Sequence, residues 1–175
     1  MSATGWPVAE LDRVARLRVL AEGIPGATFR EYHVRSGFEH TWSVLGDLER
    51  SVPIYDGQVT RLDIVDRAPA PDGVGERLRA RVRVSKWTGP LTQRFDIDLS
   101  PGWCWMVADP QLYLVGMAAE PDGTGTRLGH LEGVPLPTSA RLRPIVAPAL
   151  RLLRPLHRHH VDGDVRGIIQ LVDGS

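Results

Sequence analysis

Three side chains in the second half of the chain have types that suit acid and base chemistry: Tyr113, His130 and Glu132. His130 and Glu132 are two residues apart in an alternating segment, so on a strand they point to the same face. In an apolar enclosure they would act as general acids and bases, because burial raises the pKa of a carboxyl group toward neutrality. The structural alternative is that His130 and Glu132 form a hydrogen-bonded pair that only holds two strands together.

The segments that must position these side chains alternate between apolar and polar residues, which is typical of strands. Turn signals built from Pro, Gly and Asp separate them, at residues 69–73, 89–90, 101–102, 109–110 and 121–123. This order predicts an antiparallel meander with one apolar face. A long Leu-rich helix ends the chain and is expected to cover this face, and a curved sheet around one helix encloses a cavity.

One alternating segment indicates which face of the meander is exposed. Arginine occupies every second position from 77 to 83, and apolar residues stand between. In the next segment Asp96 and Asp98 alternate with apolar side chains, and a hairpin at 89–90 sets them opposite the arginines. The arginine face is therefore predicted to be solvated and neutralised by carboxylates, which argues against a nucleic-acid partner.

Tight turns at 101–102 and 109–110 carry the same alternation into the following strands. On that phase Trp103 and Trp105 point outward and need a cover, which an N-terminal helix or the second subunit of a homodimer would provide. Inward side chains are expected to contact a ligand, together with two histidines of the terminal helix beside the cavity mouth. These ligand-binding candidates are Lys86, Gln93, Phe95, Met106, Met117, His157 and His160.

The terminal helix carries a second group of residues with metal-ligating types. His157, His160 and Asp164 are spaced i, i+3 and i+7, so they share one helix face. This spacing is common by chance, and no fourth protein ligand is evident in the sequence. We therefore expect no metal at this face, with the two histidines beside the cavity and Asp164 paired with an arginine.

Composition is that of one ordinary globular domain with a sizeable core. The chain has 175 residues, 42% hydrophobic and 24% charged, and its formal net charge of zero gives no reason for wholesale phosphate binding. Cys104 is the only cysteine, which excludes an internal disulfide and a cysteine-based zinc site. Residues 1–18 lack the apolar region of a signal peptide and no apolar run is long enough to cross a bilayer, so we expect a cytoplasmic location.

A basic stretch without acidic residues, 133–161, leads into the terminal helix. It contains five arginines and three histidines, and prolines at 144, 148 and 155 predict a kinked helix. A basic amphipathic segment can lie on an anionic membrane surface. The favoured alternative is a core helix whose arginine stems lie along apolar surface.

Two further helical patterns are expected near the start of the chain. Apolar residues at helical spacing from about residue 8 to 20 predict a helix outside the meander, so we place an N-terminal helical extension at 1–26 and the main domain at 27–175. A second pattern follows the first β-like run (28–34) and extends from 36 to about 50. Ser36 is its predicted N-cap, with Glu39 at the capping-box position, and Pro53 its predicted stop.

Several short motifs in and after this second pattern resemble those of a known superfamily. They are Thr41-Trp42, Leu45-Gly46-Asp47, Val52-Pro53 and Val74-Gly75-Glu76. Over about residues 27–172 the chain is similar to the START-like, or SRPBCC, superfamily, and most of all to its polyketide cyclase/dehydrase and lipid-transport branch. The resemblance implies a Bet v 1-like helix-grip fold of the α+β class. In that fold a seven-stranded antiparallel curved sheet surrounds a long C-terminal helix, two short helices follow the first strand, and here a helix precedes it.

The resemblance also implies a function, in which a hydrophobic small molecule of polyketide-like, aromatic or lipid type binds between sheet and helix. The leading hypothesis is a cyclase or dehydratase, a lyase that works by enolisation and loss of water. Tyr113, His130 or Glu132 would supply acid and base, and no cofactor is required. The alternatives are a non-catalytic carrier or sensor of such a ligand, and a membrane-peripheral protein that uses the basic helix.

Overall fold

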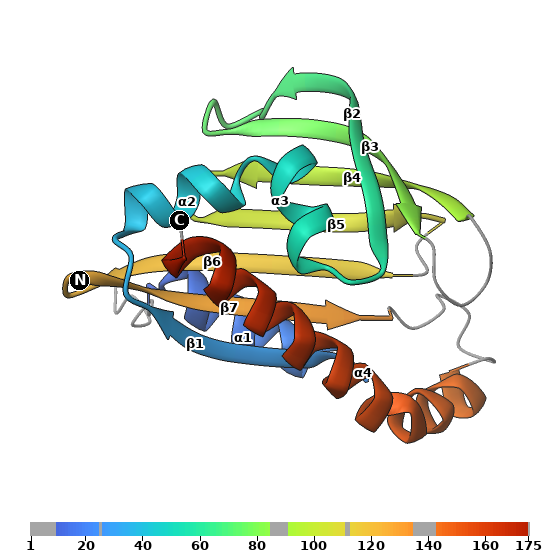
Figure 1. Ribbon diagram of the computed structural model, residues 1–175. Coiled ribbons are helices and arrows are strands. Elements are labelled where there is room, and N and C mark those ends of the chain that lie inside the picture. Colours follow the sequence, from blue (N-terminus) through green and yellow to red (C-terminus); the bar gives the residue numbers. More distant parts are fainter. Residues whose placement is uncertain (1–9, 25, 85–90, 111–112, 135–142, 175) are drawn as a thin grey trace, which may run out of the picture.

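The structure is a computed structural model that describes residues 10–24, 26–84, 91–110, 113–134 and 143–174, with side chains left undescribed for most of 143–156. Its elements, in chain order, are α1 (Arg13–Glu22), β1 (Thr28–Val34), α2 (Phe38–Leu45), α3 (Leu48–Tyr55), β2 (Val59–Pro69), β3 (Glu76–Val84), β4 (Leu91–Ser100), β5 (Trp103–Asp109), β6 (Leu114–Asp122), β7 (Gly125–Gly133) and α4 (Arg143–Asp173). The predicted succession of a strand, short helices, a meander and a long helix is confirmed (Figure 1).

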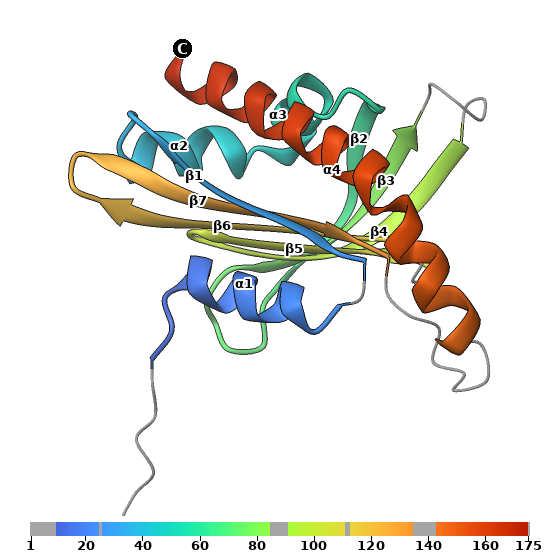
Figure 2. The ribbon, with the colours of Figure 1, turned by 90° about the horizontal axis from the view of Figure 1, so that it is seen from below.

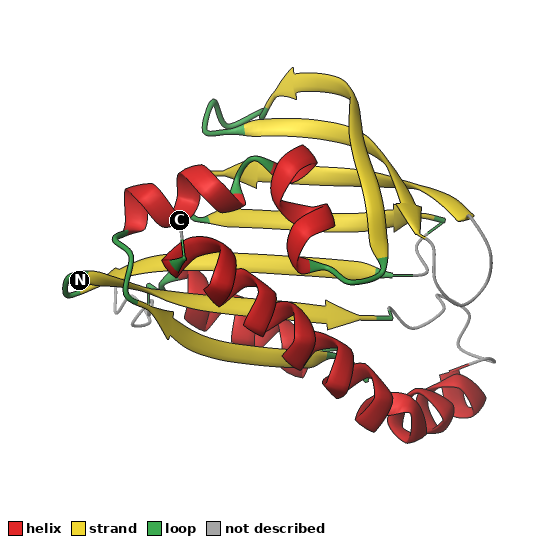
Figure 3. Cartoon of the chain, in the orientation of Figure 1, coloured by secondary structure: helices red, strands yellow, loops and turns green. Residues whose placement is uncertain are grey.

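Seven antiparallel strands form one curved sheet in the order β1-β7-β6-β5-β4-β3-β2 (Figure 1). The chain therefore runs as a meander from β2 to β7, and β1 pairs with the last strand of the meander. Helices α2, α3 and α4 lie on one face of the sheet, which we call the inner face and which carries Phe95 and Met106 (Figure 3). Helix α1 lies on the opposite, outer face (Figure 2).

The β3–β4 hairpin has the orientation that its alternation predicts. Arg77 is opposite Asp98 and Arg79 is opposite Asp96, with Nε–Oδ1 distances of 3.4 and 3.5 Å. These four side chains are exposed, whereas the apolar residues between the arginines are buried in the core. The prediction of a solvated arginine face is confirmed.

The turns after β4 and β5 preserve this alternation. Ser100 pairs with Trp103 across Pro101-Gly102, a two-residue turn in which Gly102 has a φ of 75°, the left-handed region that glycine adopts without strain. After β5, the Ala108 amide donates to the Tyr113 carbonyl (2.9 Å). Tyr113 therefore keeps the inward phase that the sequence predicts, although the turn itself includes residues outside the described ranges.

Helix α1 provides the cover that the outward tryptophans need. Val14 and Leu17 are fully buried against the outer face, beside the stacked rings of Trp103 and Trp105 (centroids 6.3 Å apart). Gly116 makes this close packing feasible, because a Cβ there would lie 2.6 Å from a Leu17 methyl carbon. With this cover in place, the tryptophan pair no longer argues for a homodimer.

Three local predictions near residues 36–55 are wrong. The single helix expected from 36 is two helices, separated at Gly46-Asp47, and Pro53 lies inside α3 rather than ending it. Tyr55 is buried in the core, so packing extends the helix past the proline. Ser36 is not an N-cap, because its hydroxyl donates to the Val172 carbonyl (3.1 Å) and so ties this segment to α4.

Helix α4 crosses the inner face with its C-terminal half, where Val161, Ile168 and Val172 are fully buried. Its first turns run at an angle to the rest, in the part that contains Pro148 and Pro155, as the predicted kink requires (Figure 1). Most side chains of the basic stretch 133–161 lie outside the described residues, so its role at a membrane surface stays a prediction. Among the described residues, none of the helices has the length and apolarity needed to cross a membrane.

Candidate functional site

A cavity of about 310 Å³ lies between the inner face of the sheet and helices α3 and α4. Its wall is mostly apolar and comes from adjacent strands, with Val82, Phe95, Met106 and Val115 among the lining side chains. Polar groups are concentrated where β7 approaches α4 and the end of α3. Those that line the cavity there are Asp56, Tyr113, His130, Glu132 and His160.

The three predicted acid–base residues meet at this polar end. Val115 pairs with Glu132 across β6 and β7, so Tyr113, two residues earlier, faces the same side beside Glu132. The Tyr113 hydroxyl donates to Glu132 Oε2, and His130 Nε2 donates to Glu132 Oε1 (2.9 Å). His130 and Glu132 are 0% and 2% exposed, so Glu132 is a buried carboxylate that accepts hydrogen bonds from both partners.

Helix α4 adds two imidazoles and a carboxyl group to this site. The i, i+3, i+7 face is formed as predicted: His157 Nε2 lies 3.4 Å and His160 Nε2 lies 3.5 Å from Glu132 Oε2. Asp164 Oδ2 lies 3.3 Å from His160 Nε2, and Asp164 is 2% exposed. The predicted pairing of Asp164 with an arginine is wrong. This helix face packs toward the cavity, and among the described residues the ion-pair partner of Asp164 is His160.

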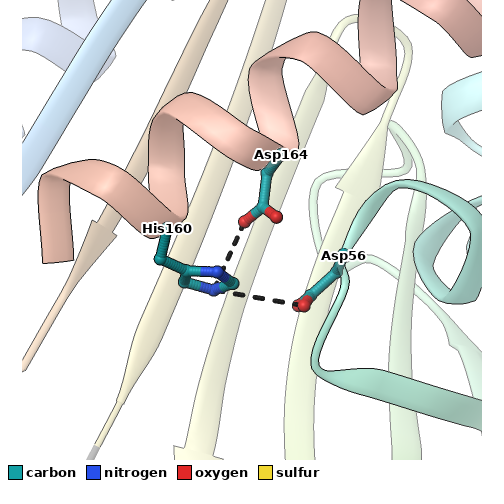
Figure 4. Close-up of side chains that lie close together, drawn as sticks. All are labelled: Asp56, His160 and Asp164. Atoms are coloured by element: carbon teal, nitrogen blue, oxygen red, sulfur yellow. Dashed lines mark ion pairs between the residues drawn. The ribbon is translucent and has the colours of Figure 1, made fainter. Parts of the chain in front are cut away.

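The end of α3 supplies a third carboxyl group, which the sequence analysis missed. Asp56 Oδ1 lies 4.0 Å from His160 Nε2 and accepts a hydrogen bond from the Gln58 amide (2.8 Å) (Figure 4). Asp56 follows a helix and precedes a turn at Gly57, where an aspartate ordinarily caps the backbone. Nothing in its local pattern indicates that α3 packs against α4. We call these seven residues the Glu132 cluster: Asp56, Tyr113, His130, Glu132, His157, His160 and Asp164.

The carboxyl groups of the Glu132 cluster have pKa values shifted in opposite directions. Burial alone would raise the pKa of Glu132, but hydrogen bonds from His130 and His157 hold it well below its usual range. Burial raises the pKa of Asp164 to about 10, with further contributions from the hydrogen bond to Glu132 and from its charge. Burial also raises the pKa of Asp56. At neutral pH, Glu132 is therefore an anion and Asp164 keeps its proton.

The expectation that burial raises the pKa of the strand carboxyl group is thus wrong for Glu132, because hydrogen bonds from His130 on the same strand and from His157 on α4 outweigh burial. Burial does raise the pKa of Asp164, which lies on α4. Burial raises the pKa of the Tyr113 phenol well above its ordinary value, and the negative charge of Glu132 adds to this shift. Tyr113 is therefore a hydrogen-bond donor at any physiological pH.

The predicted ligand-binding residues have different positions relative to the cavity. Gln93, Phe95, Met106 and His160 line it. His157 contacts Glu132 and Tyr113 at the edge of the cluster. Met117 lies in the closed part of the core, where its sulfur accepts a hydrogen bond from the Tyr55 hydroxyl (3.5 Å). Lys86 lies outside the described residues.

Comparison with known proteins finds likeness in structure only. No protein-family model matches the sequence, and no curated protein has a similar sequence. Among solved structures, the chain is similar to TTHA0849 from Thermus thermophilus, with a TM-score of 0.61 and 18% identity over 83% of this chain and 96% of that one.

Two aromatase/cyclases are similar to a comparable degree. The di-domain ARO/CYC StfQ from the steffimycin biosynthetic pathway has a TM-score of 0.62 and 16% identity, and the match covers 92% of this chain but 55% of StfQ. The Zhui aromatase/cyclase from Streptomyces sp. R1128 has a TM-score of 0.58 and 14% identity, over 82% of this chain and 90% of that one. Together with the seven-stranded sheet around α4, these likenesses show that the chain has the helix-grip fold.

Proposed function

We propose that the chain binds an apolar small molecule with carbonyl or hydroxyl oxygens, of aromatic or polyketide-like type, and catalyses its cyclisation or dehydration. The observation that carries this proposal is an apolar cavity with a single polar end, at which a buried anion and a buried neutral acid stand side by side. Its volume of about 310 Å³ is at the lower end of the range of small-molecule sites.

The polar end has the groups that enolisation and dehydration require. One group must take a proton from the carbon next to a carbonyl, and another must donate a proton to the oxygen that leaves as water. Carboxyl groups whose environments separate their pKa values are suited to these two roles. In the Glu132 cluster, His160 lines the cavity between Asp164 and Glu132, where it can take the carbon-bound proton. Asp164 lies behind His160 and is not among the residues that line the cavity, so its proton would reach the leaving oxygen through His160.

Glu132 is then a positioning residue for the imidazoles rather than the base itself, because an acid with a strongly lowered pKa binds protons poorly. Tyr113 and His130 hold its two oxygens and so fix the orientation of the carboxylate. The structural likeness to StfQ and Zhui, both aromatase/cyclases, supports this class of reaction.

A carrier or sensor is the second candidate, and one observation favours it. The Glu132 carboxylate is surrounded by donors of its own chain, so this carboxylate is satisfied before any ligand arrives. In a carrier, these groups would only orient the oxygen atoms of the ligand.

Glu132→Gln separates the two candidates, since it keeps the shape and removes the charge. The assay uses a poly-β-ketone substrate for turnover and a hydroxylated anthraquinone for affinity, with Asp96→Asn on the outer face as the matched control. An enzyme loses about 10²- to 10⁴-fold in turnover with little change in affinity. A carrier shows no turnover and a change in affinity alone. If the unsubstituted protein binds no such compound, both candidates fail.

A further inference from the structure

Three carboxyl groups of the Glu132 cluster converge on one imidazole. They come from three different elements: Asp56 from the end of α3, Glu132 from β7 and Asp164 from α4. From His160 Nε2 the nearest carboxyl oxygens lie at 3.3 Å (Asp164), 3.5 Å (Glu132) and 4.0 Å (Asp56). Figure 4 shows His160 between the two aspartates.

In the part of the chain that the structure describes, the carboxyl groups at this point have only imidazoles as ion-pair partners. Within the described ranges, the ion pairs of these three carboxyl groups are all with histidines, and none is with arginine or lysine. Like charges in a desolvated site do not all stay ionised without a counter-charge. Asp164 shows this deficit, because it is 2% exposed and its Oδ2 has no hydrogen-bond partner among the described residues. Either a proton on Asp164 or a bound cation would satisfy this oxygen.

We propose that Asp56, Glu132, His160 and Asp164 bind a divalent first-row metal ion, such as Zn²⁺, Fe²⁺ or Mn²⁺. Tetrahedral ligands with bonds of about 2.0–2.2 Å lie about 3.3–3.6 Å apart. Two of the His160 distances fall in this range, and the ligating atoms of Asp56, His160 and Asp164 all lie within 4.8 Å of one another. A mixed set of carboxylate oxygens and imidazole nitrogen suits these ions.

The surroundings of the four ligands are those of a metal site. Carboxylates that bind metals are themselves held by hydrogen bonds. Here His130 holds Glu132, and the amides of Gln58 (2.8 Å) and Val59 (3.3 Å) hold Asp56. The sequence expectation of no metal considered the α4 residues alone, whereas the proposed set takes two ligands from α4 and two, Asp56 and Glu132, from other elements.

Three of the four ligands line the cavity, so a ligand oxygen could approach a bound ion as a fifth ligand. Catalytic use of the ion rests on the proposed function: a metal there would polarise a carbonyl and favour enolisation. With an ion bound, His160 and Asp164 would be its ligands, so the base and acid roles proposed for them apply to the metal-free protein. The binding of the ion does not depend on the proposed function. Metal binding and the proposed function are therefore tested by separate measurements.

The test titrates metal-free protein, prepared with EDTA and then dialysed, with Zn²⁺ by calorimetry and with Co²⁺ by visible absorption. We expect one ion per chain. Asp164→Asn and Asp56→Asn should each weaken Zn²⁺ binding by more than about 100-fold. This exceeds the 10- to 100-fold loss of affinity that is typical when a group hydrogen-bonded to a metal ligand is replaced. His159→Gln is the matched control, because His159 is exposed on the same helix, and it should leave affinity within about twofold.

Circular dichroism of each variant verifies that it is folded. If the unsubstituted protein takes up neither Zn²⁺ nor Co²⁺, the proposal is overturned, and a proton shared by Glu132 and Asp164 takes the place of the ion. Uptake that His159→Gln abolishes, or that both aspartate variants retain, would also overturn it, since it would show an adventitious site on surface histidines. Anthraquinone binding in the presence of EDTA reports on the proposed function alone, so either proposal can fail without the other.

Discussion

Two histidine–carboxylate pairs in this protein have the same length and different surroundings. His130 and Glu132 are 2.9 Å apart on the inner face and 0% and 2% exposed. His33 and Asp122 are also 2.9 Å apart, at the end of the sheet, and are 61% and 50% exposed. Water screens and solvates the second pair, whereas the first must satisfy itself with protein groups. Burial, and not the contact distance, therefore decides which pair has an effect on stability and chemistry.

The same contrast separates the two faces of the sheet. On the outer face, Arg81 is directly opposite Arg94, an arrangement that solvent makes tolerable, since both are exposed. On the inner face, three acids converge within reach of His160, and they shift one another's pKa. Charges on the outer face are solvated and act weakly on one another, whereas the acids on the inner face are largely buried and form the polar end of the cavity.

The largest expected effect is on stability when the buried pair is broken. His130→Ala should lower the free energy of unfolding by about 3–5 kcal/mol, because it removes a donor from a buried carboxylate and leaves a cavity. Urea denaturation measures this change. His33→Ala is the matched control, and we expect less than about 1 kcal/mol there. Equal losses in the two variants would mean that burial does not separate these pairs.

The smallest effect should come from the arginine face. Replacing both Arg79 and Arg81 with Gln is expected to change the free energy of unfolding by less than about 1 kcal/mol. Arg79 is 71% exposed, and its ion-pair partners Asp66 and Asp96 are exposed as well. Anthraquinone affinity, measured by fluorescence, should stay within about threefold. A 100-fold loss of affinity with the fold intact would place the ligand on the outer face.

Much of the fold follows from period-two alternation and turn residues, which are local signals. They were sufficient to place Phe95, Met106 and Tyr113 on the inner face and the arginines outside. Local signals do not reveal how helices pack. The prediction of Ser36 as a cap rests on its neighbours in the chain. Its actual hydrogen-bond partner, the Val172 carbonyl of α4, is 136 residues away and leaves no local signal.

The site was predictable to the extent that it lies on strands. Tyr113, His130 and Glu132 were brought together by alternation and strand pairing, and α4 spacing placed His157 and His160 nearby. Asp56 was missed because its position depends on the packing of α3 against α4. The lowered pKa of Glu132 was missed because the hydrogen bonds that outweigh burial come from His130, its neighbour on β7, together with His157, which α4 brings to the site.

The central claim is that a small molecule binds in the inner cavity against the Glu132 cluster. Methyl-labelled NMR spectra during titration with a hydroxylated anthraquinone test it most directly. We expect saturable shifts of the Val82, Met106 and Val115 methyl groups, which line the cavity, and none for Val14 and Leu17, which pack under α1. Shifts at Val14 and Leu17 with the cavity methyl groups unchanged would contradict the account.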